Sequence, residues 1–235
     1  MATSGSTDFT LNRDEIIKEA FSTIEIGVEG EALDPEEIVI GARNLNIVLK
    51  AMQGRGMGLW LRDTKSITLV AAQSLYTLGA TGNVSMVRPL RILECNRKDS
   101  TGSETSMTPM SIEEYEGLPN KSQSGVPVNY HYNPTLSNGS LYLWLVPSTA
   151  EAAEYTVEIV FRTEIEDMDV AADNLDMPTE FMDAVILALA YRLAPKYGYP
   201  INERYLLRKD AKEALDDALA FDQEQESLFI QPDFR

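Results

Sequence analysis

The chain has one cysteine, Cys95, and one histidine, His131, among its 235 residues. A single cysteine excludes an intrachain disulfide and fits a reducing cytosol. Zinc sites take three or four ligands mainly from these two residue types, so the usual zinc sites are excluded as well. No stretch approaches about 18 consecutive apolar residues, so the sequence predicts no membrane span.

Basic residues are also scarce. The chain has 20 Lys and Arg against 37 Asp and Glu, a formal net charge of -17. Residues 164–235 hold 17 of the acids and 7 of the bases, and residues 164–183 hold eight acids and no base. An acidic surface repels nucleic acid, so we expect the chain neither to bind DNA phosphates nor to bind DNA sequence-specifically. The same repulsion would let DNA slide past without sticking.

Few residues suggest catalysis or metal binding. His131 lies between Tyr130 and Tyr132 on a predicted strand, and we interpret it as facing solvent or a neighbour. Cys95 also lies on a predicted strand and is interpreted as a small, inert core residue. Residues 164–176 are rich in oxygen ligands, but they lack the spacing of an EF-hand calcium loop. The sequence therefore predicts no catalytic residue, no cofactor and no metal site. Since a glycosidase needs only two carboxylates, a cell-wall glycosidase remains a minor alternative.

Helices are predicted near both ends of the chain. Apolar residues recur at helical spacing in residues 13–26 and from Asp34 onward, where a proline and two acids follow the aspartate. A third helix follows Met177 and is apolar nearly all round from Ala184 to Ala190, so it must be surrounded by protein. The last helix is predicted over residues 202–226.

Three glycines between residues 54 and 58 raise the question of a phosphate cradle. Such a cradle follows a strand and opens a helix. Here a predicted helix precedes the glycines and a predicted strand follows them, so we interpret the run as the end of the helix.

The hydrophobic period changes to two between residues 59 and 165, which predicts strands. The clearest is residues 154–164, where Tyr155, Val157, Ile159 and Phe161 share one face. A single helical turn with a capping box is expected at Ser111–Tyr115. The predicted strands are Leu59–Arg62, Ser66–Ala72, Ser74–Leu78, Arg88–Asn96, Val126–Tyr132, Leu141–Val146 and Glu154–Glu164.

These patterns predict an α+β fold: a discontinuous bundle of about four helices, an inserted antiparallel β-sandwich or barrel-like domain, and an extended C-terminal tail. The expected boundaries are 1–58 and 171–226 for the helical domain, 59–170 for the β-domain and 227–235 for the tail.

Short motifs along most of the chain give a more specific indication. They are Leu45-Asn46 with Leu49, Gly58-Leu-Trp60, Tyr76-Thr-Leu78, Ile112-Glu-Glu-Tyr115 with Leu118-Pro119, Gly125-Val-Pro127, Leu143-Trp-Leu-Val-Pro147, Asp176-Met-Pro178-Thr-Glu180 and Leu193-Ala-Pro-Lys-Tyr-Gly198. In this order, on a helix–β–helix plan, the chain resembles the head-to-tail adaptor proteins of short-tailed bacteriophages.

The resemblance implies a structural protein of the virion neck, assembled in the host cytoplasm, and not an enzyme. Such adaptors form a dodecameric ring beneath the portal protein, extend its DNA channel, help retain packaged DNA and dock tail nozzle or tail fibre proteins. Another ring-forming tail subunit is the alternative within this class. No membrane partner is expected.

The resemblance also implies that the C-terminal segment reaches the portal. The expected portal-binding residues are Leu228, Phe229, Ile230, Pro232, Phe234 and Arg235. Alternatively, this segment folds back on its own domain. The acids expected to line the channel are Asp216, Asp217, Asp222 and Glu224.

Overall fold

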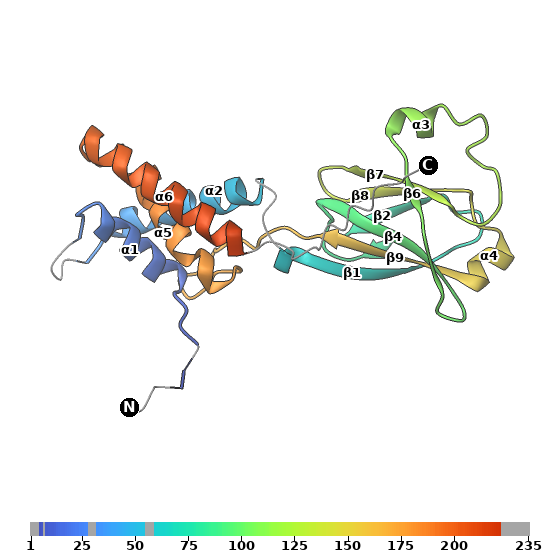
Figure 1. The fold of residues 1–235 in the computed structure, drawn as a ribbon, viewed down its shortest axis with the longest axis horizontal. Coiled ribbons are helices and arrows are strands. Elements are labelled where there is room, and N and C mark those ends of the chain that lie inside the picture. Colours follow the sequence, from blue (N-terminus) through green and yellow to red (C-terminus); the bar gives the residue numbers. More distant parts are fainter. Residues whose placement is uncertain (1–4, 7, 28–31, 55–58, 222–235) are drawn as a thin grey trace, which may run out of the picture. The chain divides into compact units, whose positions relative to one another are not determined.

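The computed structural model describes residues 5–6, 8–27, 32–54 and 59–221, and the chain divides into two compact units (Figure 1). The helical unit combines Met1–Trp60 with Ile165–Arg235, and the β-unit is Leu61–Glu164. The mixed α+β class expected from the sequence is confirmed. None of the described helices has both the length and the hydrophobicity needed to cross a membrane.

The first two helices of the helical unit begin at capping boxes. In α1 (Arg13–Thr23) the Asn12 side chain accepts a hydrogen bond from Glu15 N at 3.0 Å, and the Glu15 carboxylate accepts one from Asn12 N at 2.9 Å. In α2 (Pro35–Gln53) the Glu37 carboxylate accepts a hydrogen bond from Asp34 N at 3.0 Å. These reciprocal bonds satisfy amides that a helix N-terminus leaves free.

The chain's second half completes this unit with α5 (Met182–Leu193) and α6 (Ile201–Phe221), after the short 3₁₀ helix η2 (Thr179–Phe181). Helix α5 contacts α1, α2 and α6, which confirms that its apolar sequence is surrounded by protein. Helices α1 and α2 approach closely at Gly41, where a Cβ atom would lie 2.5 Å from Ile17 Cγ2. Only glycine fits there without a shift of Ile17.

The β-unit consists of two sheets. One contains four strands in the order β1 (Arg62–Thr68), β9 (Tyr155–Arg162), β4 (Arg91–Asp99) and β5 (Glu104–Ser106), all antiparallel. The other contains five in the order β3 (Val84–Ser85), β2 (Leu75–Gly79), β8 (Gly139–Trp144), β7 (Asn129–Pro134) and β6 (Thr108–Pro109). The two-residue strands β3 and β6 pair in parallel with their neighbours, so the sheets are not purely antiparallel as expected.

One hydrophobic core joins the two sheets. It includes Leu78 of β2, Leu141 and Leu143 of β8, and Ile159 and Phe161 of β9, all at most 1% exposed. Strand β9 alternates buried and partly buried residues, as its sequence predicted. Burial of such side chains is worth about 1.5–3 kcal/mol each, so this core holds the sheets together.

Some local predictions were wrong. Residues Leu59–Leu61 form a 3₁₀ helix, η1, so the strand predicted at Leu59–Arg62 begins only at Arg62. Strand β1 ends at Thr68, short of the predicted Ala72. The helical turn expected at Ser111–Tyr115 is confirmed as α3 (Ile112–Glu116), whereas α4 (Thr149–Glu154) was not predicted.

Candidate interaction surfaces

Most of the site residues expected from the sequence lie outside the described part of the chain. This holds for all six residues of the expected portal-binding segment and for Asp222 and Glu224. Asp216 and Asp217 are described, and both are exposed on α6.

Asp216 and Asp217 are neighbours on α6 but lie on different faces of the helix. Successive residues of an α-helix point about 100° apart, so Asp216 and Asp217 do not share a face. Asp217 lies in line with other exposed acids spaced by three, four or seven residues. We call this set the acidic face of α6, and it comprises Glu203, Asp210, Glu213 and Asp217. Lys209 beside it is paired with Glu213 at 3.3 Å, so its charge is compensated.

Asp216 instead lies at the edge of a groove. This groove, of about 730 Å³, is lined by residues of α2, α5 and α6 and is called the α2–α5–α6 groove below. Its apolar lining includes Val48, Met52 and Leu215, which are 6%, 4% and 3% exposed. The side chain of Tyr191, a residue that is 36% exposed, adds an aromatic wall.

Three cations also line the α2–α5–α6 groove: Arg192, Arg208 and Lys212, all exposed. They are three of the seven bases in residues 164–235. None of them forms an ion pair with a carboxylate of the described residues. The groove therefore combines an apolar floor with positive charge in a chain whose net charge is -17.

A buried asparagine holds one of these cations in place. Asn44, which is 3% exposed, accepts hydrogen bonds on Oδ1 from Arg192 Nε at 3.0 Å and from Lys196 Nζ at 3.1 Å. Its Nδ2 donates to the Ile40 carbonyl at 2.6 Å. The amide is neutral, so it orients the two cations without cancelling their charge. No motif in the sequence singled out this residue.

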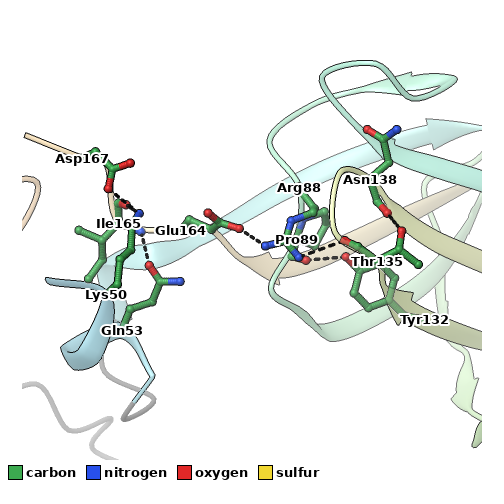
Figure 2. A network of polar contacts seen from close by, with 10 residues as sticks. All are labelled: Lys50, Gln53, Arg88, Pro89, Tyr132, Thr135, Asn138, Glu164, Ile165 and Asp167. Carbon is green, nitrogen blue, oxygen red and sulfur yellow. Dashed lines mark hydrogen bonds and ion pairs between the residues drawn. The ribbon is translucent and has the colours of Figure 1, made fainter. Parts of the chain in front are cut away.

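Each end of the Glu164–Ile165 connection is bound within its own unit, as Figure 2 shows. In the helical unit, Ile165 N donates to Gln53 Oε1 at 3.0 Å, and Lys50 Nζ donates to the Ile165 carbonyl at 2.6 Å. Lys50 also pairs with Asp167 at 3.0 Å.

In the β-unit, Glu164 forms an ion pair with Arg88 (Figure 2). Tyr132 donates its hydroxyl proton to the Pro89 carbonyl next to it. Burial raises the pKa of the Tyr132 hydroxyl to about 12, with Arg88 acting in the opposite direction. A neutral phenol therefore fastens this part of the β-unit at ordinary pH.

His131 and Cys95, the two residues considered for catalysis, are buried and packed against neighbouring side chains. His131 is 9% exposed, its Nδ1 lies 3.0 Å from the Met110 carbonyl oxygen, and its ring stacks with Tyr115 and Tyr142. It thus faces neighbours rather than solvent. Cys95 is 1% exposed in the sandwich core, and burial raises its pKa to about 12, which leaves the thiol unreactive.

In the acidic stretch after the β-unit, two aspartate side chains accept hydrogen bonds from nearby backbone amides. Asp176 accepts a hydrogen bond from Glu166 N at 3.2 Å, and Asp173 accepts one from Val170 N at 2.6 Å. Within the described residues, no three His, Cys, Asp or Glu side chains gather as a metal site would require.

The chain was compared with known protein families, curated proteins and solved structures. No curated protein matches the chain. A solved chain described as the neck of an empty GTA particle, computed with C6 symmetry, shares 14% identity over 80% of this chain and 83% of its own, with a TM-score of 0.27. A second, described as the neck of a native GTA particle computed with C12 symmetry, shares 11% identity over 80% and 82%, with a TM-score of 0.26.

The family comparison covers more of the chain and is decisive. Residues 31–231 match the family described as SU10 adaptor protein. The match runs through α2, the whole β-unit, α5 and α6. The resemblance noted in the sequence motifs is thereby confirmed, and the chain belongs to the SU10 adaptor family of phage head-to-tail adaptor proteins.

Proposed function

We propose that the chain assembles into a dodecameric ring beneath the portal of a phage virion. There it extends the DNA channel, helps to retain packaged DNA, and provides the surface on which tail nozzle or tail fibre proteins dock. The observation that carries this proposal is the family match over residues 31–231, which includes both units. The family is one of structural adaptors, so the chain is a structural protein and not an enzyme.

The proposed contact with the portal is the C-terminal segment. Residues 228–235 include Leu228, Phe229, Ile230 and Phe234. Burial of such side chains contributes about 1.5–3 kcal/mol each. Because every subunit of a ring offers the same anchor, simultaneous binding multiplies the affinity well beyond that of one segment.

The proposed lining of the channel is acidic. Asp216, Asp217, Asp222 and Glu224 belong to a helix end and a following segment that carry many acids and few bases. Acidic side chains repel phosphates, so DNA would pass without forming contacts that slow it. The exposed acidic face of α6 supports Asp217 in this role, and it adds Glu203, Asp210 and Glu213 as further candidates.

The first experiment measures mass by light scattering, for the purified chain alone and mixed with the portal of its phage. A monomer that forms a large stoichiometric complex only with portal supports the adaptor proposal. A chain that ignores the portal but forms a ring by itself supports the alternative of another ring-forming tail subunit. Turnover of peptidoglycan, abolished by a single Glu→Gln change, would instead support the glycosidase alternative.

A further inference from the structure

The α2–α5–α6 groove has chemistry that matches one segment of the chain. Its apolar floor of Val48, Met52 and Leu215 suits aliphatic and aromatic side chains. The cations Arg192, Arg208 and Lys212 on its walls suit carboxylates. A ligand for this groove must therefore carry several acids close to a short apolar run.

Residues 222–230 have this composition. They read Asp-Gln-Glu-Gln-Glu-Ser-Leu-Phe-Ile, with three acids, no base, and three consecutive large apolar residues at the end. They also follow α6 directly, and α6 itself supplies Arg208, Lys212 and Leu215 to the groove. We propose that in the free subunit residues 222–230 dock into the α2–α5–α6 groove of the same chain.

The distances permit this docking. Arg208 precedes the last residue of α6 by 13 positions, which correspond to roughly 20 Å along a helix axis. Nine extended residues span up to about 30 Å, so the segment is long enough to turn back along α6 as far as Arg208. Its carboxylates then outnumber Asp216, the one acid of the described groove lining, and face the three cations, while Leu228, Phe229 and Ile230 cover the apolar floor.

This inference deepens the proposed function, because the groove and the portal would compete for the same apolar residues. A subunit whose anchor lies in its own groove presents no free anchor to other proteins until the portal displaces it. The experiment on docking uses the free subunit without portal. Its result is therefore independent of the portal-binding experiment, and either proposal can be wrong while the other is right.

Disulfide trapping in the full-length chain tests the docking. The variant Ala188→Cys/Ser227→Cys places one thiol on α5 in the groove and one in the segment. Asp210→Cys/Ser227→Cys is the control, since position 210 lies on the exposed acidic face of α6 and is not among the residues that line the groove. The natural Cys95 is buried and does not interfere.

Docking predicts an intrachain disulfide that forms at least tenfold faster in the groove variant than in the control, with the mass of a monomer. Adding Arg208→Glu and Lys212→Glu to the groove variant should lower its rate of disulfide formation to that of the control. Reversing the segment as well, with Glu224→Lys and Glu226→Lys, should restore the fast rate. If the variant with Arg208→Glu and Lys212→Glu does not fold, a salt experiment replaces it. High salt screens exposed charges, so it should slow disulfide formation in Ala188→Cys/Ser227→Cys several-fold. Equal rates at the two positions, or disulfides formed mainly between chains, would overturn the proposal.

Discussion

Arg192 Nε donates a hydrogen bond of 3.0 Å to the side-chain oxygen of Asn44, across the contact between α5 and α2. Asn44 is 3% exposed, and a variant that lacks its amide removes the protein acceptor that Arg192 and Lys196 share. We expect Asn44→Ala to lower the free energy of unfolding by about 1–3 kcal/mol. Urea denaturation followed by circular dichroism measures this, and Asn202→Ala, at an exposed position, is the control and should change it by less than about 0.5 kcal/mol. Equal effects of the two changes would mean that the buried amide is dispensable.

A pair of leucines tests the core of the β-unit. Leu143 is 0% exposed between the sheets, whereas Leu136 is 96% exposed. Removing a buried leucine side chain costs about 2–5 kcal/mol, so Leu143→Ala should shift the denaturation midpoint strongly. Leu136→Ala should leave it nearly unchanged. A comparable loss in both variants would contradict the sandwich core described above.

The portal contact predicts a clear effect of truncation. Deleting residues 228–235 should leave the subunit folded, because the described core lies within residues 8–221, but it should abolish complex formation with the portal. Light scattering of the mixture measures this. Phe229→Ser/Phe234→Ser in the full-length chain is the gentler companion and should weaken binding by at least tenfold. A truncated chain that bound the portal with full affinity would exclude this segment as the anchor.

Charge reversal tests the acidic channel. Asp216→Lys/Asp217→Lys, and separately Asp222→Lys/Glu224→Lys, should spare ring assembly but slow DNA ejection, since lysines in a channel attract phosphates. Ejection from reconstituted particles is the readout. The control Glu113→Lys/Glu116→Lys reverses the same amount of charge at exposed positions of α3 and should have no effect. Normal ejection in both of these double variants would exclude the four acids from the DNA path.

The buried thiol gives a prediction about pH. Burial raises the pKa of Cys95 from 9.0 to about 12, so the folded chain keeps a proton that the unfolded chain releases above pH 9. Stability from this group is therefore complete below pH 9 and is lost as the pH rises toward 12. At pH 8 a thiol reagent should label the native chain far more slowly than the urea-unfolded one. Rapid labelling of native protein would show that the core opens readily.

The sequence predicted the parts of this fold that depend on local interactions. Helix starts at Asp34 and Ser111 followed from capping residues, which act within four positions of the chain. The two-residue strands β3 and β6 could not be predicted, because they exist only through pairing with distant partners. Helix α4 did carry a usable signal, since Ser148 and Glu151 form a capping box.

The interaction surfaces could be predicted from the sequence only in part. The acids near the end of α6 could be identified from charge, and helical spacing alone separates Asp216 from Asp217, but only the fold shows that Asp216 lies at the α2–α5–α6 groove. The α2–α5–α6 groove draws Val48 from one end of the chain and Tyr191 and Lys212 from the other. No local pattern connects such residues, so only the folded arrangement brings them together.

The discontinuous helical unit also fixes an order of events on the ribosome. Helix α5, which contacts α1, α2 and α6, lies after the complete β-unit in the chain. Helices α1 and α2 therefore emerge without α5, which packs against both of them, and they stay without it while the whole sandwich is synthesised. Domains of a nascent chain fold as they become complete. The inserted unit can thus reach its native state first, and the unit that begins the chain is the last to form.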